Sequence, residues 1–469
     1  MRRVTQLCLV AALAALLSPA VASSAPRMYV GFHDDVAFRW NPNRTEVLAQ
    51  ARSANATIVR TLVDWSKTAP TRPANAANPF DPAYRFSDID ELVRNAQQRG
   101  LEVVITIWGT PKWANGGKTP NNVPTNVNDL KNFSRAVASR YSGRYAQYPW
   151  VGRYSVWNES NLQLFLTPQF DARGQIVGPR NYARLYAAAY AGIKAGSPRS
   201  RVAIGETSSH GRDRELAGKS DTIAPATFAR LVAAANPRLR FDGWAHHPYP
   251  VPVGMKPTQK VRWPNVSLAS LPQFEKSLDV WFKRRGIPIW ITEYGHETRP
   301  AEPAGVTLAQ QASYVRQAMT IVRADPRVEM FVWFIWQDSR TSLWQSGMVT
   351  LSGATKPALR PFTTEALRVD ARNPLIRTRS GQRRVTVRLP LREFCVTNPP
   401  ATAIGATVRV RLGSSLVAVS QPELLLGSDC TGATALNLRL AAKRTYVATF
   451  DLNDDSGLTT RRTVTIQTL

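Results

Sequence analysis

The sequence predicts a (β/α)8 barrel followed by a small antiparallel β-sandwich. From residue 28 to about 370, short apolar runs alternate with amphipathic stretches of helical period, and strands alternating with helices form parallel sheets. Eight such units fit a closed barrel with enlarged loops after the strands. No glycine-rich phosphate loop follows the first run, which disfavours a doubly wound open sheet. Beyond residue 371 apolar and polar residues alternate with a period of two.

The predicted barrel strands share one form, an apolar run that ends in polar or aromatic residues. They are Met28–His33, Thr57–Val63, Leu101–Trp108, Val151–Glu159, Arg201–Thr207, Phe241–His247, Ile287–Glu293 and Val328–Trp336. Amphipathic helices are expected between them. Three of these are Tyr84–Arg99, Asn181–Ala195 and Gln310–Ala324, the first two closed by a glycine.

The chain divides into three predicted parts: residues 1–25, a barrel over 26–370 and a sandwich over 371–469. In the last part, Arg384–Leu389, Ala406–Arg411 and Arg462–Ile466 alternate between apolar and polar residues. Short alternating strands with polar turns are typical of a β-sandwich. Because no low-complexity linker separates the barrel from the sandwich, we expect the two to pack together.

Residues 1–25 have the form of a secretory signal peptide. Arg2 and Arg3 are followed by the apolar run Leu7–Leu17 and by Ala20-Val21-Ala22, the small-residue pattern at which signal peptidases cut. An uncleaved signal acting as an anchor is the alternative. No later stretch of about twenty apolar residues follows, so we expect an exported protein with no stable membrane insertion, secreted or associated with the cell envelope.

Two cysteines remain once Cys8 leaves with the signal segment. In an oxidising compartment Cys395 and Cys430 are most simply a disulfide within the sandwich. A metal site there would need further ligands, and only Glu393 and Asp429 are close in sequence. We therefore expect no metal and no cofactor.

The formal net charge of +27 comes mostly from arginine. The arginines are scattered rather than clustered with aromatic residues, and no nucleic-acid-binding motif is present. A solvated, arginine-rich surface is one reading of this charge. Attraction to an anionic envelope or matrix polymer is the other. Nucleic acid is not an expected partner, and we expect a monomer.

Polar and aromatic residues gather at the ends of the predicted strands, where a barrel of this type carries its chemistry. A layer serving packing alone would show valine and isoleucine instead. The second strand contains Arg60. The strand-end residues are Asp64, Trp65, Trp108, Trp157, Asn158, Glu159, Glu206, His246, His247, Tyr249, Thr292, Glu293, Tyr294, Trp333 and Trp336.

Two glutamates stand at the ends of the fourth and seventh strands, Glu159 and Glu293. Opposite strands of a small barrel bring such carboxylates close together. Paired carboxylates suit glycoside hydrolysis, in which one protonates the leaving oxygen while the other meets the oxocarbenium-like carbon. The two must titrate differently, and a tyrosine or arginine beside one would keep it ionised.

Several motifs in order resemble the retaining glycoside hydrolases of clan A, most closely families 39 and 5. Trp157-Asn158-Glu159-Ser160-Asn161 resembles the W-N-E-P-N motif, with serine where proline is usual, and Ile291-Thr292-Glu293-Tyr294-Gly295 resembles the nucleophile strand. The loop Thr110-Pro111-Lys112-Trp113-Ala114 also resembles its counterpart. The resemblance implies a carbohydrate substrate with β linkage, Glu159 as general acid/base and Glu293 as nucleophile.

The resemblance also implies roles for substrate-binding residues. Asn158 would contact the sugar 2-hydroxyl, Arg60 would hold the nucleophile ionised, and His247-Pro248-Tyr249 matches a motif whose tyrosine lies beside the nucleophile. Trp333 or Trp336 would supply the platform under the sugar. Trp108 belongs to the same strand-end group.

Three alternatives remain open at this point. The chain could be a carbohydrate-binding relative without turnover, or a transglycosylase using the same site. It could also be a metal-dependent hydrolase using His246, His247 and Glu206, but adjacent strand residues point to opposite faces, which disfavours chelation by both histidines. The sugar, exo or endo action and the role of the sandwich stay undecided.

Overall fold

The computed structural model describes residues 27–340, 344–397 and 400–469; the predicted signal segment lies outside them. Eight parallel strands close into a barrel in sequence order, with β8 paired to β1. The strands are β1 Tyr29–His33, β2 Ile58–Asp64, β3 Glu102–Trp108, β4 Arg153–Val156, β5 Arg201–Ser208, β6 Gly243–His247, β7 Ile289–Tyr294 and β8 Val328–Phe334. The predicted barrel is confirmed.

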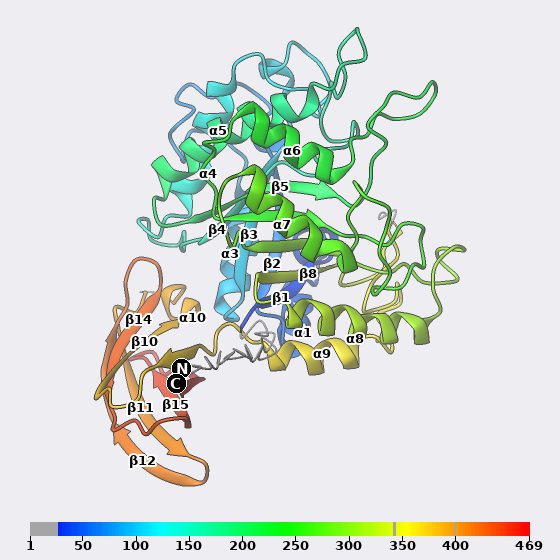
Figure 1. The fold of residues 1–469 in the computed structure, drawn as a ribbon. Coiled ribbons are helices and arrows are strands. Elements are labelled where there is room, and N and C mark those ends of the chain that lie inside the picture. The colour runs from blue at the N-terminus through cyan, green and yellow to red at the C-terminus, as the bar shows by residue number, and fades with distance from the viewer. Residues whose placement is uncertain (1–26, 341–343, 398–399) are drawn as a thin grey trace, which may run out of the picture.

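Helices cover the outside of the barrel (Figure 1). They are α1 Arg44–Ser53, α2 Trp65–Thr68, α3 Ser87–Gln98, α4 Val127–Arg140, α5 Gly178–Gly196, α6 Pro225–Ala235, α7 Leu271–Trp281, α8 Leu308–Ala324 and α9 Leu359–Arg368, with short turns η1 Val36–Trp40, η2 Lys112–Ala114 and η3 Leu268–Ser270. The three predicted helices correspond to α3, α5 and α8. Within the described residues no helix is both long and apolar enough to cross a membrane.

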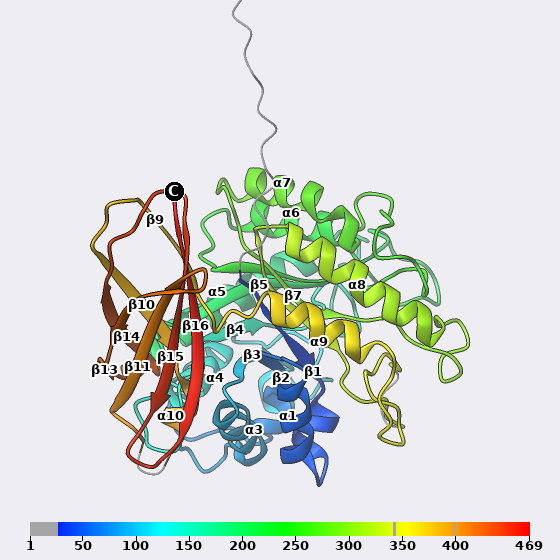
Figure 2. The ribbon, with the colours of Figure 1, turned by 90° about the horizontal axis from the view of Figure 1, so that it is seen from below.

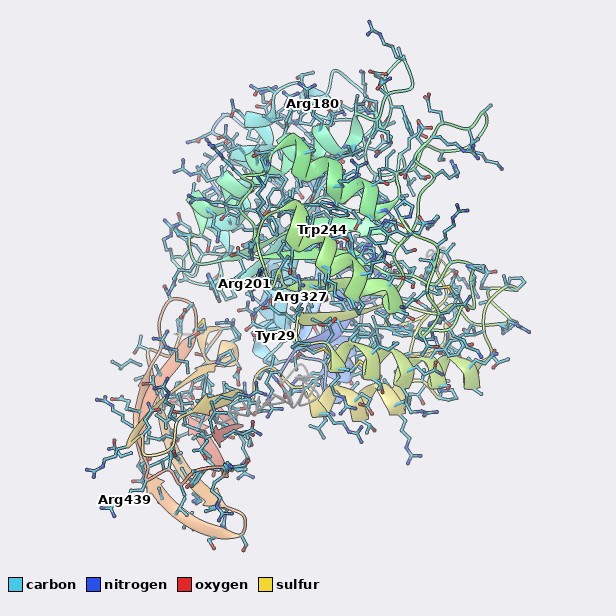
Figure 3. The ribbon with its side chains drawn as sticks, in the orientation of Figure 1. Tyr29, Arg180, Arg201, Trp244, Arg327 and Arg439 are labelled. Atoms are coloured by element: carbon cyan, nitrogen blue, oxygen red, sulfur yellow. A yellow bond between two sulfur atoms is a disulfide. The ribbon has the colours of Figure 1, made fainter. Side chains whose placement is uncertain are left out.

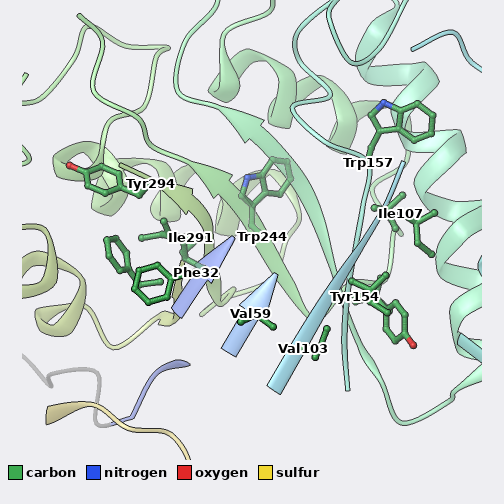
Figure 4. Packing of buried hydrophobic residues seen from close by; sticks show 14 of the residues in the cluster. Phe32, Val59, Val103, Ile107, Tyr154, Trp157, Trp244, Ile291 and Tyr294 are labelled. Atoms are coloured by element: carbon green, nitrogen blue, oxygen red, sulfur yellow. The ribbon is translucent and has the colours of Figure 1, made fainter. Parts of the chain in front are cut away.

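The barrel has two apolar layers because strand side chains alternate between its faces. The inner layer is small and fully buried: Ile58, Val104, Ala203, Ala245, Trp290, Met330 and Val332. The outer layer packs against the helices and includes Phe32, Val59, Val103, Trp244 and Ile291 (Figure 4). The fourth strand is shorter than predicted. It ends at Val156 because Trp157 and Glu159 take left-handed backbone angles, with φ of 72° and 36°.

The remaining strands form a β-sandwich around a second apolar core. One sheet pairs β10 Arg384–Pro390 with β14 Thr431–Asn437. The other contains β9 Leu375–Thr378, β11 Ala403–Leu412, β12 Ser415–Ser420, β13 Glu423–Leu425, β15 Thr445–Asn453 and β16 Thr459–Thr468. Pairing is antiparallel except for β9 with β16, which run parallel. A disulfide joins Cys395 of α10 (Arg392–Cys395) to Cys430, as predicted.

The sandwich packs against the side of the barrel that carries β4, α4 and α5 (Figure 2). The contact centres on Glu102, the first residue of β3, which is only 1% exposed. Its carboxylate accepts from Arg392 Nε of the sandwich at 2.8 Å and lies 3.4 Å from Arg153 of β4. Two charged groups from the barrel and one from the sandwich therefore form a single buried network.

Candidate active site

The carboxyl ends of the barrel strands bring charged side chains together in one cluster. Three residues at these ends have left-handed backbone angles, which cost free energy for non-glycine residues and concentrate at functional sites. They are Trp157, Glu159 and Glu206, the last with φ of 46°. The local backbone thus turns sharply where β4 and β5 reach the mouth of the barrel.

Glu293 on β7 is held by four side chains. Tyr249 donates its hydroxyl to Oε2 at 2.8 Å. His33 Nδ1 lies 3.2 Å from Oε1, and Arg60 makes a short contact to the same oxygen. His247 Nδ1 lies 3.6 Å from Oε2. Glu293 is only 7% exposed, so these donors replace the water that its carboxylate lacks.

Arg60 links the glutamate to the fourth and fifth strands. Its guanidinium is fully buried and donates from NH2 to Asn158 Oδ1 at 2.9 Å and to Glu206 Oε2 at 3.2 Å. Its Nε donates to Thr106 Oγ1 at 2.9 Å. The arginine is thereby fixed in one orientation, and the amide nitrogen of Asn158 has no hydrogen-bond partner among the described residues.

His247 on β6 lies between three carboxylates. Its Nε2 is 2.7 Å from Glu206 Oε2, and its Nδ1 is 3.2 Å from Glu159 Oε1. The same Nδ1 lies 3.6 Å from Glu293 Oε2. The distance between Glu159 Oε1 and Glu293 Oε2 therefore cannot exceed the sum of their two distances to Nδ1. Thr292 donates a further hydrogen bond to Glu206 at 2.9 Å.

The protonation states follow from this arrangement. Burial alone would raise the pKa of Glu293, but His247, Arg60 and His33 outweigh it and hold the pKa well below its usual value. Burial is likewise outweighed at Glu206, whose pKa Arg60 and His247 lower. Burial would lower the pKa of His247, but Glu293, Glu159 and Glu206 raise it to about 10. At neutral pH the site thus pairs the His247 imidazolium with the ionised carboxylates of Glu293 and Glu206.

His246 points away from this cluster. Its Nδ1 lies 2.9 Å from Thr207 Oγ1 and its Nε2 lies 3.1 Å from the carbonyl of Val266, while its ring packs against Phe274 of α7. Adjacent His246 and His247 therefore face opposite sides of β6. Across the described ranges, no three His, Cys, Asp or Glu side chains are grouped so as to hold a metal ion.

The two tryptophans expected beneath the sugar lie elsewhere. Trp333 is fully buried toward the helices, where it donates to the carbonyl of Ser346 at 2.8 Å and packs against Tyr294. Trp336, 2% exposed, packs edge-on against Phe32. Trp333 packs toward the helices and Trp336 lines a separate pocket beside α1 and α9, so the structure does not support the expected platform at these positions.

Two other aromatic residues stand beside the cluster instead. Trp344, on the loop after β8, lies 4.7 Å from Tyr249 between ring centroids. Phe334, the last residue of β8, lies 5.2 Å from His33 and 6.4 Å from Tyr249. Both are half-buried. These two rings, unlike Trp333 and Trp336, contact side chains that hold Glu293.

Sequence reasoning also left two charged residues out of the site. His33 ends β1 and contacts Glu293, and Glu206 contacts both Arg60 and His247. The signal for each was present, because both are polar residues at the end of an apolar run. Glu206 was listed among the strand-end residues but was given a role only as a ligand in the metal alternative.

A cavity of about 410 Å³ adjoins the site at the ends of β1, β2 and β3. Trp40 and Trp108 line it together with charged residues, among them Asp35, Asp64 and Arg39. Trp40 is 54% exposed, and Trp108 is half-buried against Phe165. Indoles alternating with carboxylates and cations form a surface suited to a polyhydroxyl ligand.

A closed (β/α)8 barrel with paired glutamates, an arginine and an H-x-Y sequence at its strand ends defines a glycoside hydrolase of clan A. The sequence model described as Cellulase (glycosyl hydrolase family 5) matches residues 29–339. Since the match covers well over half of the chain, this protein belongs to glycosyl hydrolase family 5. No curated protein matches the chain.

Solved structures share the fold at low sequence identity. One is a family 39 glycoside hydrolase from Bacteroides cellulosilyticus WH2, 16% identical, with a TM-score of 0.51 over 88% of this chain and 80% of the other. Another is a GH5_18 protein from Streptomyces cattleya in complex with GlcNAc, 16% identical, with a TM-score of 0.53 over 80% of this chain and 88% of the other. Identities this low show a common fold alone.

Proposed function

We propose that this glycoside hydrolase cleaves β-linked oligo- or polysaccharides with retention of configuration, with Glu293 as nucleophile and Glu159 as general acid/base. The observation that carries the proposal is the set of donors on Glu293. Tyr249, His33, Arg60 and His247 all contact this carboxylate. A carboxylate kept ionised in this way is ready to attack an anomeric carbon.

Glu159 has the environment of the second residue. Its side chain is 14% exposed, and His247 Nδ1 lies 3.2 Å from its Oε1. A shared contact with His247 limits the distance between the two carboxylates, and this is compatible with the separation of about 5–5.5 Å that retention requires. A carboxyl reachable from solvent can pass its proton to the leaving oxygen and recover one from water.

The reaction would proceed in two displacements. First, Glu293 bonds to the anomeric carbon while Glu159 protonates the glycosidic oxygen, and the sugar-oxygen bond breaks to release an alcohol. Then Glu159 takes a proton from water, the resulting oxygen attacks the anomeric carbon, and the bond to Glu293 breaks. The free amide nitrogen of Asn158 would donate to the sugar 2-hydroxyl during both steps.

We further propose that the protein acts outside the cytoplasm. The signal-like sequence of residues 1–25 and the Cys395–Cys430 disulfide support this. The polar cavity with Trp40 and Trp108 supports a substrate longer than one sugar unit.

The decisive experiment is hydrolysis of a panel of aryl glycosides and polysaccharides, with the anomeric product followed by NMR during the first minutes. We expect β-linked substrates to react and to release the β-anomer first. Initial release of the α-anomer from a β-linked substrate would contradict double displacement. Hydrolysis of α-linked substrates alone would contradict the proposed linkage.

A further inference from the structure

A second pocket lies far from the strand ends, between the floor of the barrel and the sandwich. Its volume is about 320 Å³, at the lower end of the range of about 300–1,000 Å³ typical of small-molecule sites. In Figure 3, Tyr29 and Arg201, two of its lining residues, lie at the junction of the two parts. Five of its lining residues are arginines and none is acidic: Arg153, Arg199, Arg201, Arg388 and Arg392.

The arginines come from both parts of the molecule. Arg153 begins β4 and Arg201 begins β5, both at the amino ends of barrel strands. Arg388 belongs to β10 and Arg392 begins α10, both in the sandwich. The pocket therefore exists only where the sandwich meets the barrel.

Positive charge exceeds negative charge around this pocket. Glu102 pairs with both Arg153 and Arg392, Glu329 pairs with Arg201 at 2.7 Å, and Asp429 pairs with Arg199 at 3.2 Å. Arg388 is exposed and has no ion-pair partner among the described residues. Five guanidinium groups thus share three carboxylates, and the uncompensated charge faces the cavity.

Two of the five arginines are held in place by aromatic rings of the pocket wall. Arg392 lies over Trp150 at 4.6 Å and Arg153 lies over Tyr29 at 4.0 Å, measured from the guanidinium carbon to the ring centroid. Guanidinium groups fixed on aromatic faces are pre-organised for planar, bidentate contact with oxyanions. Because those ring faces are already covered, they are not available to stack on a neutral sugar.

We propose that this pocket is a second binding site for a sugar-sized oxyanion carried by an acidic polysaccharide, such as a uronate or a sulfated or phosphorylated sugar. The site would anchor an anionic chain at the floor of the barrel, while the mouth of the barrel carries the hydrolytic site. The inference does not depend on the roles proposed for Glu159 and Glu293.

The test is isothermal titration of the mature protein with four-residue oligosaccharides that differ only in charge: an oligo-uronate, a sulfated oligomer and the neutral parent. Inorganic phosphate is a fourth probe. The double variant Arg199→Gln/Arg388→Gln removes two exposed guanidinium groups and leaves the buried Glu102 network intact. Arg439→Gln, exposed at the far end of the sandwich (Figure 3), is the matched charge control.

We expect at least one acidic probe to bind with a dissociation constant at least tenfold weaker in the double variant and unchanged in Arg439→Gln. The uronate and sulfate arms distinguish the source of the oxyanion. Unchanged melting temperatures would show that the variants fold.

Three results would overturn the proposal. One is the absence of binding by every acidic probe at low salt. Another is equal weakening in Arg439→Gln, which would show only non-specific attraction to net charge. The third is tighter binding of a single-stranded oligonucleotide of equal charge than of any acidic oligosaccharide, which would assign the pocket to a different polymer.

Discussion

His247 contacts Glu206 through Nε2 at 2.7 Å, at the floor of the candidate active site. Glu206 is fully buried and also accepts from Arg60 and Thr292. The contact fixes the Nε2 edge of the imidazole, so that Nδ1 on the other side of the ring is directed at Glu159 and Glu293. Glu206 is thus a positioning residue, acting on the site through His247 and Arg60.

Replacing Glu206 by an uncharged residue should therefore alter the titration of His247. In Glu206→Gln we expect the pKa of His247 to fall from its value of about 10, because one of three stabilising carboxylates is lost. NMR of the imidazole protons measures this shift. We expect kcat to fall at least tenfold, about 1.4 kcal/mol in activation free energy, with a smaller change in KM. An unchanged imidazole titration would contradict the positioning role.

The two proposed catalytic glutamates should fail in different ways. Glu293→Ala should be inactive alone and should form an inverted glycosyl azide when azide is supplied, because azide fills the space of the lost nucleophile. Glu159→Ala should lose about 10²–10⁴-fold on substrates with poor leaving groups and little in the first step on activated aryl glycosides. Product stereochemistry by NMR distinguishes the two. Glu215→Ala, at an exposed loop carboxylate, is the control, and wild-type rates in either site variant would contradict the assignment.

Substitutions can distinguish the binding role expected of Trp344 from the packing role expected of Trp336. Trp344→Ala should raise KM, with a loss of about 0.5–1.5 kcal/mol in binding from an aromatic contact, since Trp344 stands beside Tyr249. Trp336→Ala should instead lower the free energy of unfolding by about 3–5 kcal/mol, because this indole is buried under the helices. Steady-state kinetics and urea unfolding of both variants test the distinction. A raised KM with unchanged stability in Trp336→Ala would restore the original expectation.

The protonated form of His247 should make the free energy of unfolding decrease as the pH rises into the alkaline range. Its pKa of about 10 in the folded protein exceeds the ordinary value of 6.5, so its contribution is fully present below pH 6.5 and is lost as pH rises toward 10. Glu293 behaves in the opposite sense. Its lowered pKa contributes stability above its ordinary pKa that is lost in acid. Urea unfolding at several pH values should show a smaller loss between pH 7 and 10 in His247→Asn than in the wild type. Parallel curves would contradict this.

The disulfide should stabilise the sandwich measurably. Cys395 and Cys430 are separated by 35 residues, and closing a loop of this length contributes about 3–4 kcal/mol in the chain-entropy model. The variant Cys395→Ser/Cys430→Ser should unfold at correspondingly lower urea concentration. Two free thiols in unreduced wild-type protein, detected by mass mapping, would contradict the prediction.

Much of the barrel could be predicted because each strand carries its own local signal. The apolar runs lie within a few residues of the observed strands. The polar residues within or at the ends of these runs include Arg60, Asn158 and Glu293, which the structure brings into contact through Arg60. Side-chain direction was harder to predict. In β8, Met330 and Val332 face the barrel interior, so Trp333 must face the helices, and a shift of one residue exchanges it for Phe334.

Other parts of the site could not be predicted from local patterns. Trp344 belongs to an irregular loop after β8, and no periodicity relates it to Tyr249, which follows β6. The bridging role of Glu206 requires Arg60 and His247 to be placed first, and these residues are distant in sequence. Contacts of this kind depend on barrel closure, which a linear pattern predicts only as a topology.

The network at Glu102 has a consequence for the order in which the protein can assemble. This carboxylate begins β3, yet its nearer partner is Arg392, which is synthesised 290 residues later. Until that arginine arrives, the nascent barrel holds an acid at its floor that is only partly compensated by Arg153. The barrel would therefore reach its full stability only when translation nears its end. In the complete protein, the barrel and the sandwich should unfold as one cooperative unit rather than as separate domains.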